Sequence, residues 1–259
     1  MLSVLIIGGS DSSGGAGIQA DIKTAAGLGV HSMTVITAVT AQNSTGITSI
    51  HKIPDSFIRD QLETILDDLL PDAVKIGMLY SATALKEVAR SISNHGLKNV
   101  VVDPVLRAST GRDLLEPNNI SLLKRELLSQ TDVVVPNLYE AEKLAGKKVR
   151  DISEMRDAAR ILKAIGPNVV IKGGHLEGEC VDILFDGTNF YQFSGSRIAT
   201  HYTHGTGCVF STALAISLAK GEGLIRATKS AHDFTRQAII DGYACGRGPG
   251  PVRPGLWPT

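Results

Sequence analysis

The chain has 259 residues, of which 43% are hydrophobic and 20% charged, and its 26 basic residues balance its 26 acidic residues. This composition is that of a globular protein with enough apolar residues for a large core. Proteins that bind nucleic acid or membrane surfaces usually carry a basic excess, so we expect no nucleic-acid and no membrane partner. An anionic ligand would have to be bound by a local site rather than by the field of the whole protein.

Cysteine usage and the N-terminus both indicate a cytoplasmic protein. Cys180, Cys208 and Cys245 form no CxxC pair and no spacing typical of a disulfide framework, which fits a reducing compartment. The first apolar run is too short for a signal peptide or a spanning helix and lacks a basic flank. No linker, low-complexity stretch or fixed-period repeat interrupts the chain, so we expect residues 1–259 to form a single domain.

Short apolar runs alternate with amphipathic segments along most of the chain. The runs are continuous and rich in β-branched residues, as expected for strands buried on both faces, and they cover residues 4–7, 33–39, 73–76, 100–102, 133–135 and 169–171. Helical periodicity separates them, for example at residues 57–70, 84–94, 120–128 and 153–165. This alternation predicts an α/β fold with a central, mostly parallel sheet and helices on both faces.

The last third of the chain departs from this alternation. Residues 180–193 predict two strands around an Asp-Gly turn, which is a hairpin signal. From residue 206 to about residue 243 the pattern is helical, with glycines at positions 221 and 223 as an interruption. Residues 246–259 predict a loop.

Several predicted strands end in residues that can carry chemistry. Asp103, Asn137 and Lys172 each stand at or just after such an end. Ligands of open parallel sheets bind outside the carboxyl ends of the strands. Any one of these residues could simply begin a polar loop, but together they predict acidic, amide and cationic groups at one edge of the sheet.

A glycine-rich loop, GGSDSSGGAG at residues 8–17, follows the first predicted strand and precedes a helix. Residues 15–20 match the dinucleotide fingerprint G-x-G-x-x-A, but the match does not follow the strand directly. The second apolar run also leads into TAQN at residues 40–43, with no carboxylate for a ribose diol, so we reject that interpretation. A Walker A motif is absent. The loop is longer than an ordinary connector, and its glycines would let a ligand approach the backbone closely.

A second glycine-rich motif, THGTGC at residues 203–208, precedes a stretch of small and apolar residues. It predicts a buried helix whose flexible start collects free backbone N–H groups, which is an anion site suited to a transferring phosphoryl group. Because a helix N-terminus lowers a thiol pKa, Cys208 could be partly thiolate and take a proton from a substrate hydroxyl. The alternative is that Cys208 is a small buried hydrophobic residue, which is how we interpret Cys180 and Cys245.

These motifs together resemble those of the hydroxymethylpyrimidine/phosphomethylpyrimidine kinases of thiamine biosynthesis, a family of the ribokinase-like group. The matching segments follow in the family's order and span essentially the whole chain: residues 8–21, 40–43, 102–105, 136–142, 172–175, 204–208 and 246–251. Any one motif is modestly specific, whereas the ordered set is highly specific.

The resemblance implies a ribokinase-like fold with a small β element near the active site, ATP and Mg²⁺ as cofactors, and two ATP-dependent steps. Hydroxymethylpyrimidine would become its monophosphate and then its diphosphate. The implied pyrimidine site comprises Gly9, Asp21, Gln42, Met78 and Val105. The implied ATP and phosphate site comprises Asp103, Asn137, Lys172, Thr203, Gly205, Thr206 and Gly207. The implied metal ligands are Asp103 and Glu140, and the implied catalytic base is Cys208. A homodimer is expected from the resemblance alone.

The chain departs from the family pattern at three positions. Arg107 stands where members more often have a small or apolar residue, and Arg247 and Pro249 stand where they often carry histidines, so contacts there are expected to differ. Four of the seven histidines, at positions 175, 201, 204 and 232, lack metal-ligand spacing, and we interpret them as non-ligands.

Alternatives remain within the same chemistry and outside it. Pyridoxal kinases of this group can use a cysteine in the same place, some enzymes accept both substrates, and thiazole-alcohol kinases carry a similar anion hole. The Gln42-Asn43 turn and the N-terminal loop favour the pyrimidine over both. The alternative of another class is a non-catalytic pyrimidine-binding regulator. Four residues argue against it by their presence: Asp103, Asn137, Glu140 and Cys208.

Overall fold

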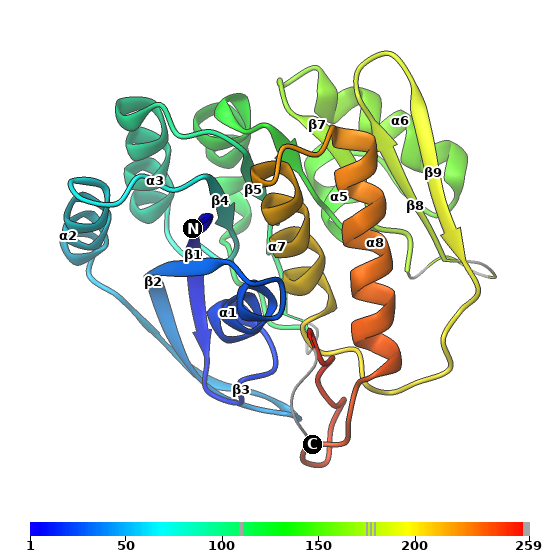
Figure 1. The fold of residues 1–259 in the computed structure, drawn as a ribbon. Helices are drawn as coiled ribbons and strands as arrows, with labels where there is room; N and C mark the ends of the chain where they lie inside the picture. The colour runs from blue at the N-terminus through cyan, green and yellow to red at the C-terminus, as the bar shows by residue number, and fades with distance from the viewer. Residues whose placement is uncertain (109–110, 175, 177, 179, 256–259) are drawn as a thin grey trace.

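A computed structural model of the chain describes residues 1–108, 111–174, 176, 178 and 180–255 (Figure 1). One nine-stranded sheet runs through this part of the chain, in the order β3-β2-β1-β4-β5-β6-β7-β8-β9. The strands are β1 (Ser3–Asp11), β2 (His31–Asn43), β3 (Gly46–Lys52), β4 (Ala73–Ile76), β5 (Val100–Val102), β6 (Val133–Val134), β7 (Asn168–Ile171), β8 (Cys180–Phe185) and β9 (Phe190–Gly195).

The centre of the sheet is parallel and its edges are antiparallel. All neighbouring strands from β2 through β7 pair in parallel, whereas β3 at one edge and β8 and β9 at the other pair antiparallel. The short central strands β4 and β5 are buried at every position, which explains their uninterrupted apolar sequences. The predicted α/β fold and the predicted hairpin are therefore confirmed.

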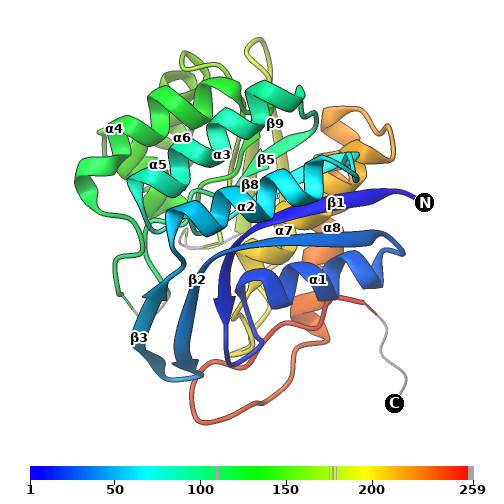
Figure 2. The ribbon, with the colours of Figure 1, turned by 90° about the vertical axis from the view of Figure 1, so that its left-hand side faces the viewer.

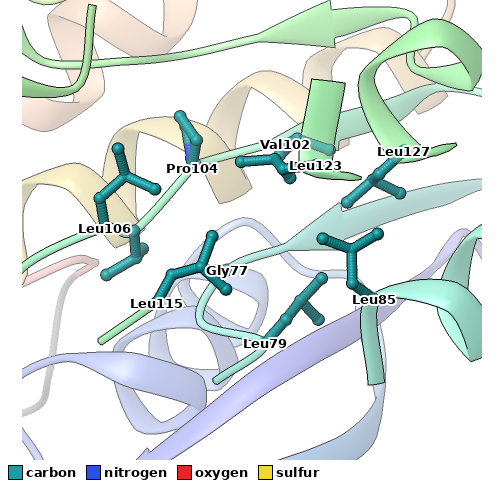
Figure 3. A pocket seen from close by; sticks show the side chains of 10 residues that line it. Gly77, Leu79, Leu85, Val102, Pro104, Leu106, Leu115, Leu123 and Leu127 are labelled. Atoms are coloured by element: carbon teal, nitrogen blue, oxygen red, sulfur yellow. The ribbon is translucent and has the colours of Figure 1, made fainter. Parts of the chain in front are cut away.

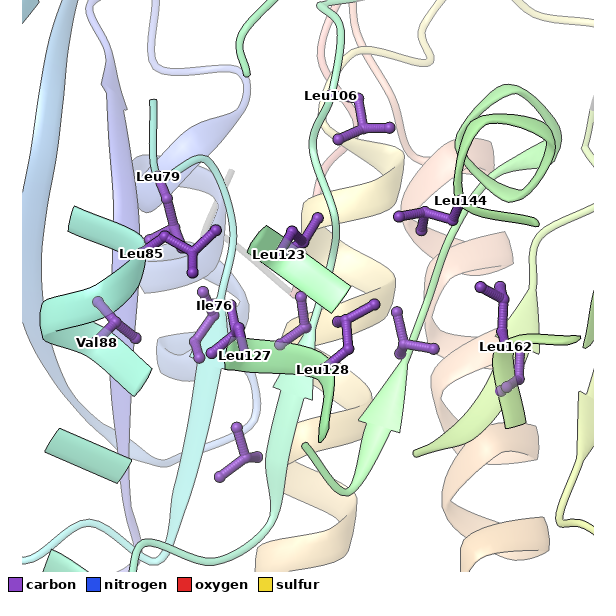
Figure 4. Packing of buried hydrophobic residues seen from close by; sticks show 14 of the residues in the cluster. Ile76, Leu79, Leu85, Val88, Leu106, Leu123, Leu127, Leu128, Leu144 and Leu162 are labelled. Carbon is purple, nitrogen blue, oxygen red and sulfur yellow. The ribbon is translucent and has the colours of Figure 1, made fainter. Parts of the chain in front are cut away.

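Helices cover both faces of the sheet (Figures 1 and 2). They are α1 (Gly17–Gly27), α2 (Asp55–Leu66), α3 (Ala82–His95), α4 (Ile120–Leu122), α5 (Leu138–Ala145), α6 (Ile152–Lys163), α7 (Thr206–Ala219) and α8 (Leu224–Ile240). Side chains alternate along β1, so Leu5 and Ile7 point to one core and Val4 and Ile6 to the other. The first core packs against α2, α3, α5 and α6 and is rich in leucine (Figure 4), and the second packs against α1, α7 and α8.

Helix α7 is apolar on nearly all sides because it lies between neighbours. Its positions from Val209 to Ser217 are all buried, and it contacts α1, α8 and the strands β4 and β5. This places its N-terminus beside the carboxyl ends of the central strands. The break between α7 and α8 falls at residues 220–223, as the glycines there predict.

Three segments differ from the sequence predictions. Strand β1 continues to Asp11, so the first four residues of the expected glycine loop pair with β2. Strand β3 is not among the predicted strands, because it is a largely exposed edge strand without a buried apolar run. The helix predicted at residues 120–128 is instead α4, a π-helical turn at Leu123–Leu127 and a 3₁₀ turn at Leu128–Gln130. No helix among the described residues is long and apolar enough to cross a membrane.

Candidate active site

The carboxyl ends of the central strands and the start of α7 converge on one point. Asp103 follows β5 and Lys172 follows β7, and their side chains are joined by a 2.8 Å contact between Lys172 Nζ and Asp103 Oδ1. A Cβ placed on Gly207 would lie 3.1 Å from Lys172 Nζ and 3.3 Å from Asp103 Oδ2. Glycine at position 207 therefore lets the helix backbone approach an acid and a base at the sheet edge.

Glu140 adds a second carboxyl group to this cluster, and Asn137 is its hydrogen-bond partner. They form a capping box at the start of α5: Asn137 Oδ1 accepts from the Glu140 N–H, and Glu140 Oε2 accepts from the Asn137 N–H, both at 2.9 Å. Burial raises the pKa of Glu140 to about 7 against the opposing charge of Lys172, and Asp103 adds to the rise. Burial would lower the pKa of Lys172, but the two carboxyl groups outweigh it and raise that pKa, so Lys172 remains charged.

The backbone after β7 is held by a largely buried pair, Asp182 and His232, from other elements. Asp182 on β8 accepts the Gly173 N–H at 2.9 Å through one oxygen and contacts His232 Nδ1 on α8 at 2.8 Å through the other. Arg197 donates to the Gly174 carbonyl at 2.9 Å. These contacts fix the backbone beside Lys172, while His175 of the same motif lies outside the described residues.

The glycine-rich segments at residues 8–17 and 203–208 pack directly against each other. Gly205, the N-cap of α7, has φ +87, and a Cβ there would lie 2.0 Å from the Gly15 carbonyl oxygen. Thr206 donates its hydroxyl to the Thr203 carbonyl at 2.7 Å and begins the helix. The first N–H groups of a helix lack intrahelical partners, and here they lie beside Asp103 and Lys172, so this helix start has the backbone donors that an anion would need.

Cys208 is the third residue of α7, and its environment differs from the one expected for a reactive thiol. Burial raises the pKa of the thiol to about 12, although Lys75 and a hydrogen bond from the Gly17 N–H lower it. The prediction that the helix N-terminus makes Cys208 partly thiolate is therefore wrong for the ligand-free protein. Desolvation and two nearby carboxyl groups outweigh the local effect of the helix.

An ion pair that the sequence reasoning missed lies behind Cys208. Lys75 Nζ is 2.7 Å from Asp21 Oδ2, with side-chain exposures of 1% and 0%, and the Thr212 hydroxyl donates to Asp21 Oδ1 at 2.8 Å. Thr212 stands four residues after Cys208, on the same side of α7. Both oxygens of Asp21 are engaged and its side chain is fully buried. Lysine inside the apolar β4 sequence was the available signal, since lysine is almost never buried unpaired.

An apolar wall gathers three of the predicted pyrimidine-site residues. A Cβ on Gly9 would lie 2.8 Å from Met78 Sδ, and Met78 packs in a small cluster with Val105 and Leu114. The Met78 carbonyl accepts the Thr37 hydroxyl at 2.6 Å, which fixes the chain after β4. The predicted residues Gly9, Met78 and Val105 are thus brought together.

Gln42 lies at the end of β2 beside two residues that were not singled out as functional. Its Nε2 is 3.4 Å from His204 Nε2, which in turn is 2.9 Å from Asp11 Oδ2. Burial would raise the pKa of Asp11, but hydrogen bonds from His204 and Ser13 outweigh it and lower the pKa to about 2. Asp11 is therefore a carboxylate at neutral pH. The two residues stand far apart in sequence, so no local pattern indicated the pair.

The departures from the family pattern lie around this site. Arg107 contacts Asp113 at 2.8 Å and stacks over the Tyr139 ring at 4.6 Å, in the loop after β5. Arg247 donates its backbone N–H to Ser44 Oγ at 3.1 Å, which ties the C-terminal segment to the β2–β3 turn. Pro249 stands two residues further along that segment.

An apolar pocket lies under the loop after β5 (Figure 3). Leucines and other apolar groups line it, and its volume is about 10 Å³. A cavity of that size holds about one water in the ligand-free protein. No group of three or more His, Cys, Asp or Glu residues suited to a metal occurs within the described part of the chain.

Comparison with known proteins points to a single family. The family model described as phosphomethylpyrimidine kinase matches residues 11–253. The chain is 43% identical over 251 residues to the hydroxymethylpyrimidine/phosphomethylpyrimidine kinase of Bacillus subtilis, covering 96% of this chain and 93% of that protein. It is 46% identical over 252 residues to a thiamine biosynthesis bifunctional protein of Geobacter sulfurreducens, covering 96% of this chain but only 51% of that longer protein.

The solved structure of a pyridoxal kinase is also similar. The Staphylococcus aureus enzyme in complex with AMP-PCP superimposes with a TM-score of 0.92 at 35% identity, covering 98% of this chain and 94% of that chain. The fold is therefore shared with an enzyme whose solved structure holds an ATP analogue.

Proposed function

The chain belongs to the phosphomethylpyrimidine kinase family, and from that premise we propose that it phosphorylates 4-amino-5-hydroxymethyl-2-methylpyrimidine to the monophosphate and then to the diphosphate, with ATP as donor. It is a phosphotransferase of the ribokinase-like fold. The observation that carries the proposal is the approach of the Gly207 backbone to Lys172 and Asp103. Backbone donors, a cation and a carboxylate then meet at one point, as phosphoryl transfer requires.

The ring of the substrate would lie against the apolar wall of Gly9, Met78 and Val105. The Gln42 amide can both donate to and accept from the edge of an aminopyrimidine, which presents a ring nitrogen and an amino group. Asp21 would not contact the ring directly. It would influence the substrate's amino and hydroxymethyl groups through the electrostatic field of its buried ion pair with Lys75. The hydroxymethyl group would then point toward the start of α7.

The nucleotide phosphates would lie between α7 and the strand ends. Residues 205–207 would supply backbone N–H groups, and Thr203 and Thr206 shape that turn. Lys172 supplies positive charge and Asn137 is the amide at the neighbouring strand end. Positioning and charge stabilisation are the main requirements of such a transfer, because its transition state is loose.

Asp103 and Glu140 fit a Mg²⁺ ion held mainly by phosphates and water. They are two buried carboxyl groups near each other. The pKa of Glu140 is raised first by burial and then by the charge of Asp103, so a bound cation would favour the ionised form of Glu140. Mg²⁺ favours one or two carboxylates with phosphate and water oxygens. When bound, the ion would neutralise charge on the phosphate oxygens.

Cys208 is proposed to receive the proton of the attacking hydroxyl. A thiol that holds its own proton cannot accept another, so this role requires the thiolate, which Lys75 and the Gly17 N–H favour and which burial opposes in the ligand-free protein. A loose transition state demands little of the base, so the positioning of the hydroxyl against the anion hole would contribute more than the thiol's basicity.

The test is the reaction itself. Purified protein with Mg-ATP and the hydroxymethylpyrimidine should yield the monophosphate and then the diphosphate, followed by phosphorus NMR or chromatography. Cys208→Ser should lower kcat while it leaves the anion hole intact, and full kcat in this variant would remove the base assignment. A protein that binds the pyrimidine but transfers no phosphate would be the non-catalytic regulator instead.

Pyridoxal is the second candidate substrate, because the similar solved structures include pyridoxal kinases over almost the full chain. We propose that the pyrimidine is the better substrate, and a parallel assay with pyridoxal decides this by the ratio of the two kcat/KM values. A ratio in favour of pyridoxal would reverse the assignment.

Assembly and location are proposals as well. We propose one domain, supported by the single sheet that runs from β1 to β9, and a homodimer, which light scattering tests by mass. A cytoplasmic location fits the free cysteines Cys180, Cys208 and Cys245, and cell fractionation would test it.

A further inference from the structure

His204 connects three segments that are distant in the sequence. Its ring nitrogen Nε2 contacts Asp11 at the end of β1, 2.9 Å away, and Gln42 at the end of β2, 3.4 Å away. Its backbone bonds the C-terminal segment twice: the N–H donates to the Gly250 carbonyl, and the carbonyl accepts from the Val252 N–H, both at 3.1 Å. His204 thus lies directly between the anion-hole turn and the residue proposed to bind the substrate ring.

The ring of His204 has almost no freedom to move. A Cβ on Gly15 would lie 2.3 Å from His204 Cδ2, so the N-terminal loop packs directly against the ring. Asp11 is held in turn by the N–H groups of Ser13 and Ala16, at 2.8 and 2.9 Å. The carboxylate and the imidazole therefore meet in a fixed geometry.

Asp11 determines which ring nitrogen carries a proton. A carboxylate can only accept hydrogen bonds, and the low pKa of Asp11 keeps it ionised at neutral pH. The 2.9 Å contact is therefore an Nε2–H donor of His204 to Asp11 Oδ2. It follows that Nε2 has no lone pair left to accept from Gln42.

The partners of the Gln42 amide then allow only one of its two orientations. The Thr40 hydroxyl lies 3.0 Å from the Ser10 carbonyl, to which it must donate, and 3.2 Å from Gln42 Oε1, while Gln42 Nε2 faces His204. The oxygen and nitrogen of an amide exchange places on a half-turn, so the hydrogen-bond partners decide between the two orientations. With its hydrogen on Ser10, Thr40 offers Gln42 an acceptor, whereas the only hydrogen on His204 Nε2 is the one given to Asp11 at 2.9 Å, which Gln42 Oε1 can share at 3.4 Å but Gln42 Nε2 cannot accept. The complementary arrangement directs Gln42 Nε2 toward Thr40 and Oε1 toward His204, and the opposite arrangement would place donor against donor.

We propose that His204, together with Thr40, is a positioning residue that fixes the orientation of the Gln42 amide and thereby makes the site selective for the amino-bearing edge of the substrate ring. This inference rests on the proposed function. An aminopyrimidine edge presents a ring nitrogen that accepts a hydrogen bond beside an amino group that donates one. The Gln42 amide matches this edge only when its Nε2 faces the ring nitrogen and its Oε1 faces the amino group, and a half-turn of the amide exchanges the two. Loss of the His204 donor would leave both amide orientations populated and would weaken the match.

The test compares two substitutions of the same shape. His204→Gln keeps an N–H donor at the reach of Nε2, and His204→Met keeps the length without the donor. His201→Gln is the control, since His201 is an exposed histidine three residues away. Each protein is assayed with the hydroxymethylpyrimidine and with its analogue that lacks the 4-amino group, and melting temperatures are compared.

We expect the wild type to prefer the amino-bearing substrate in kcat/KM. His204→Met should reduce that preference about ten- to a hundredfold, mainly through the KM of the pyrimidine, with the KM of Mg-ATP changed less than about twofold. His204→Gln should retain most of the preference, and His201→Gln all of it. Equal losses for both substrates, or equal effects of the Gln and Met variants, would overturn the proposal.

A second variant keeps the test independent of folding at position 204. Thr40→Val preserves the shape of the side chain but removes the oxygen that holds the other end of the amide, so it should reduce the preference in the same direction. An unchanged preference in Thr40→Val would count against the inference. A wild type that phosphorylates neither substrate would refute the proposed function itself.

Discussion

The buried pair of Lys75 and Asp21 permits the sharpest prediction about stability. The two charges lie 2.7 Å apart with side-chain exposures of 1% and 0%. Lys75→Met would leave a carboxylate buried with only the Thr212 hydroxyl as partner. Removing one member of such a pair costs about 3–5 kcal/mol, and because the Thr212 hydrogen bond persists, we expect about 3 kcal/mol.

The measurement is urea denaturation followed by circular dichroism, with a matched surface pair as control. Lys52 and Asp55 lie at the same distance of 2.7 Å, but their side chains are 40% and 25% exposed. Lys52→Met should therefore cost less than about 1 kcal/mol. The double variant Lys75→Met with Asp21→Asn removes both charges and should recover most of the loss.

The pH dependence of the same variant supplies an independent check. Burial already raises the pKa of Asp21, and without Lys75 that pKa rises further. The folded variant then binds a proton that the unfolded chain does not, so its stability deficit should shrink as the pH falls, by about 1.4 kcal/mol per unit below the raised pKa. The reasoning is refuted if Lys75→Met costs no more than Lys52→Met, or if its deficit grows toward acid.

Three further predictions follow from the site. With its pKa raised to about 12, Cys208 should be alkylated by iodoacetamide at pH 8 more slowly than the exposed Cys245, and faster labelling of Cys208 in peptide mass spectra would contradict the burial argument. Gly205→Ala should destabilise the protein by more than about 2 kcal/mol and abolish activity because its Cβ meets a carbonyl, whereas Gly221→Ala, at φ +80 in open space, should cost about 1 kcal/mol in thermal unfolding. The lowered pKa of Asp11, about 2, adds stability above its ordinary pKa that is lost between pH 4 and pH 2, so Asp11→Asn should flatten the acid limb of the unfolding curve, and an unchanged limb would count against it.

The central sheet was predictable because its strands are buried on both faces. Continuous β-branched runs then follow from the packing itself, as in β4 and β5. The edge strand β3 was missed because an exposed strand needs no such run. The irregular segment at residues 120–130 was predicted as one helix because its apolar spacing is helical, while its hydrogen bonds shift to π and 3₁₀ geometry.

The motif residues of the site were identifiable, but their pairings were not. Asp103, Lys172 and Gly207 each stand in a recognisable local pattern, and the sheet brings them together. The contact of Asp11 with His204 joins positions 193 residues apart, so no spacing rule could find it. The thiol pKa of Cys208 was predicted in the wrong direction. Its position at a helix start, which lowers a thiol pKa, can be read from the local sequence, whereas its burial, which raises that pKa, depends on the packing of distant segments.

The contacts of residues 203–208 with the end of β1 and with residues 250–252 have a consequence for synthesis on the ribosome. Strand β1 lies inside the sheet, yet the turn that covers its end comes from residues 203–208, and that turn is held by residues 250–252. A nascent chain can assemble the N-terminal strands early, but it lacks Thr212 and the start of α7 until residues 203–252 have been made. The proposed active site therefore forms after the N-terminal strands, and chains released before that point should be both inactive and open to proteases at the unfinished edge of the sheet.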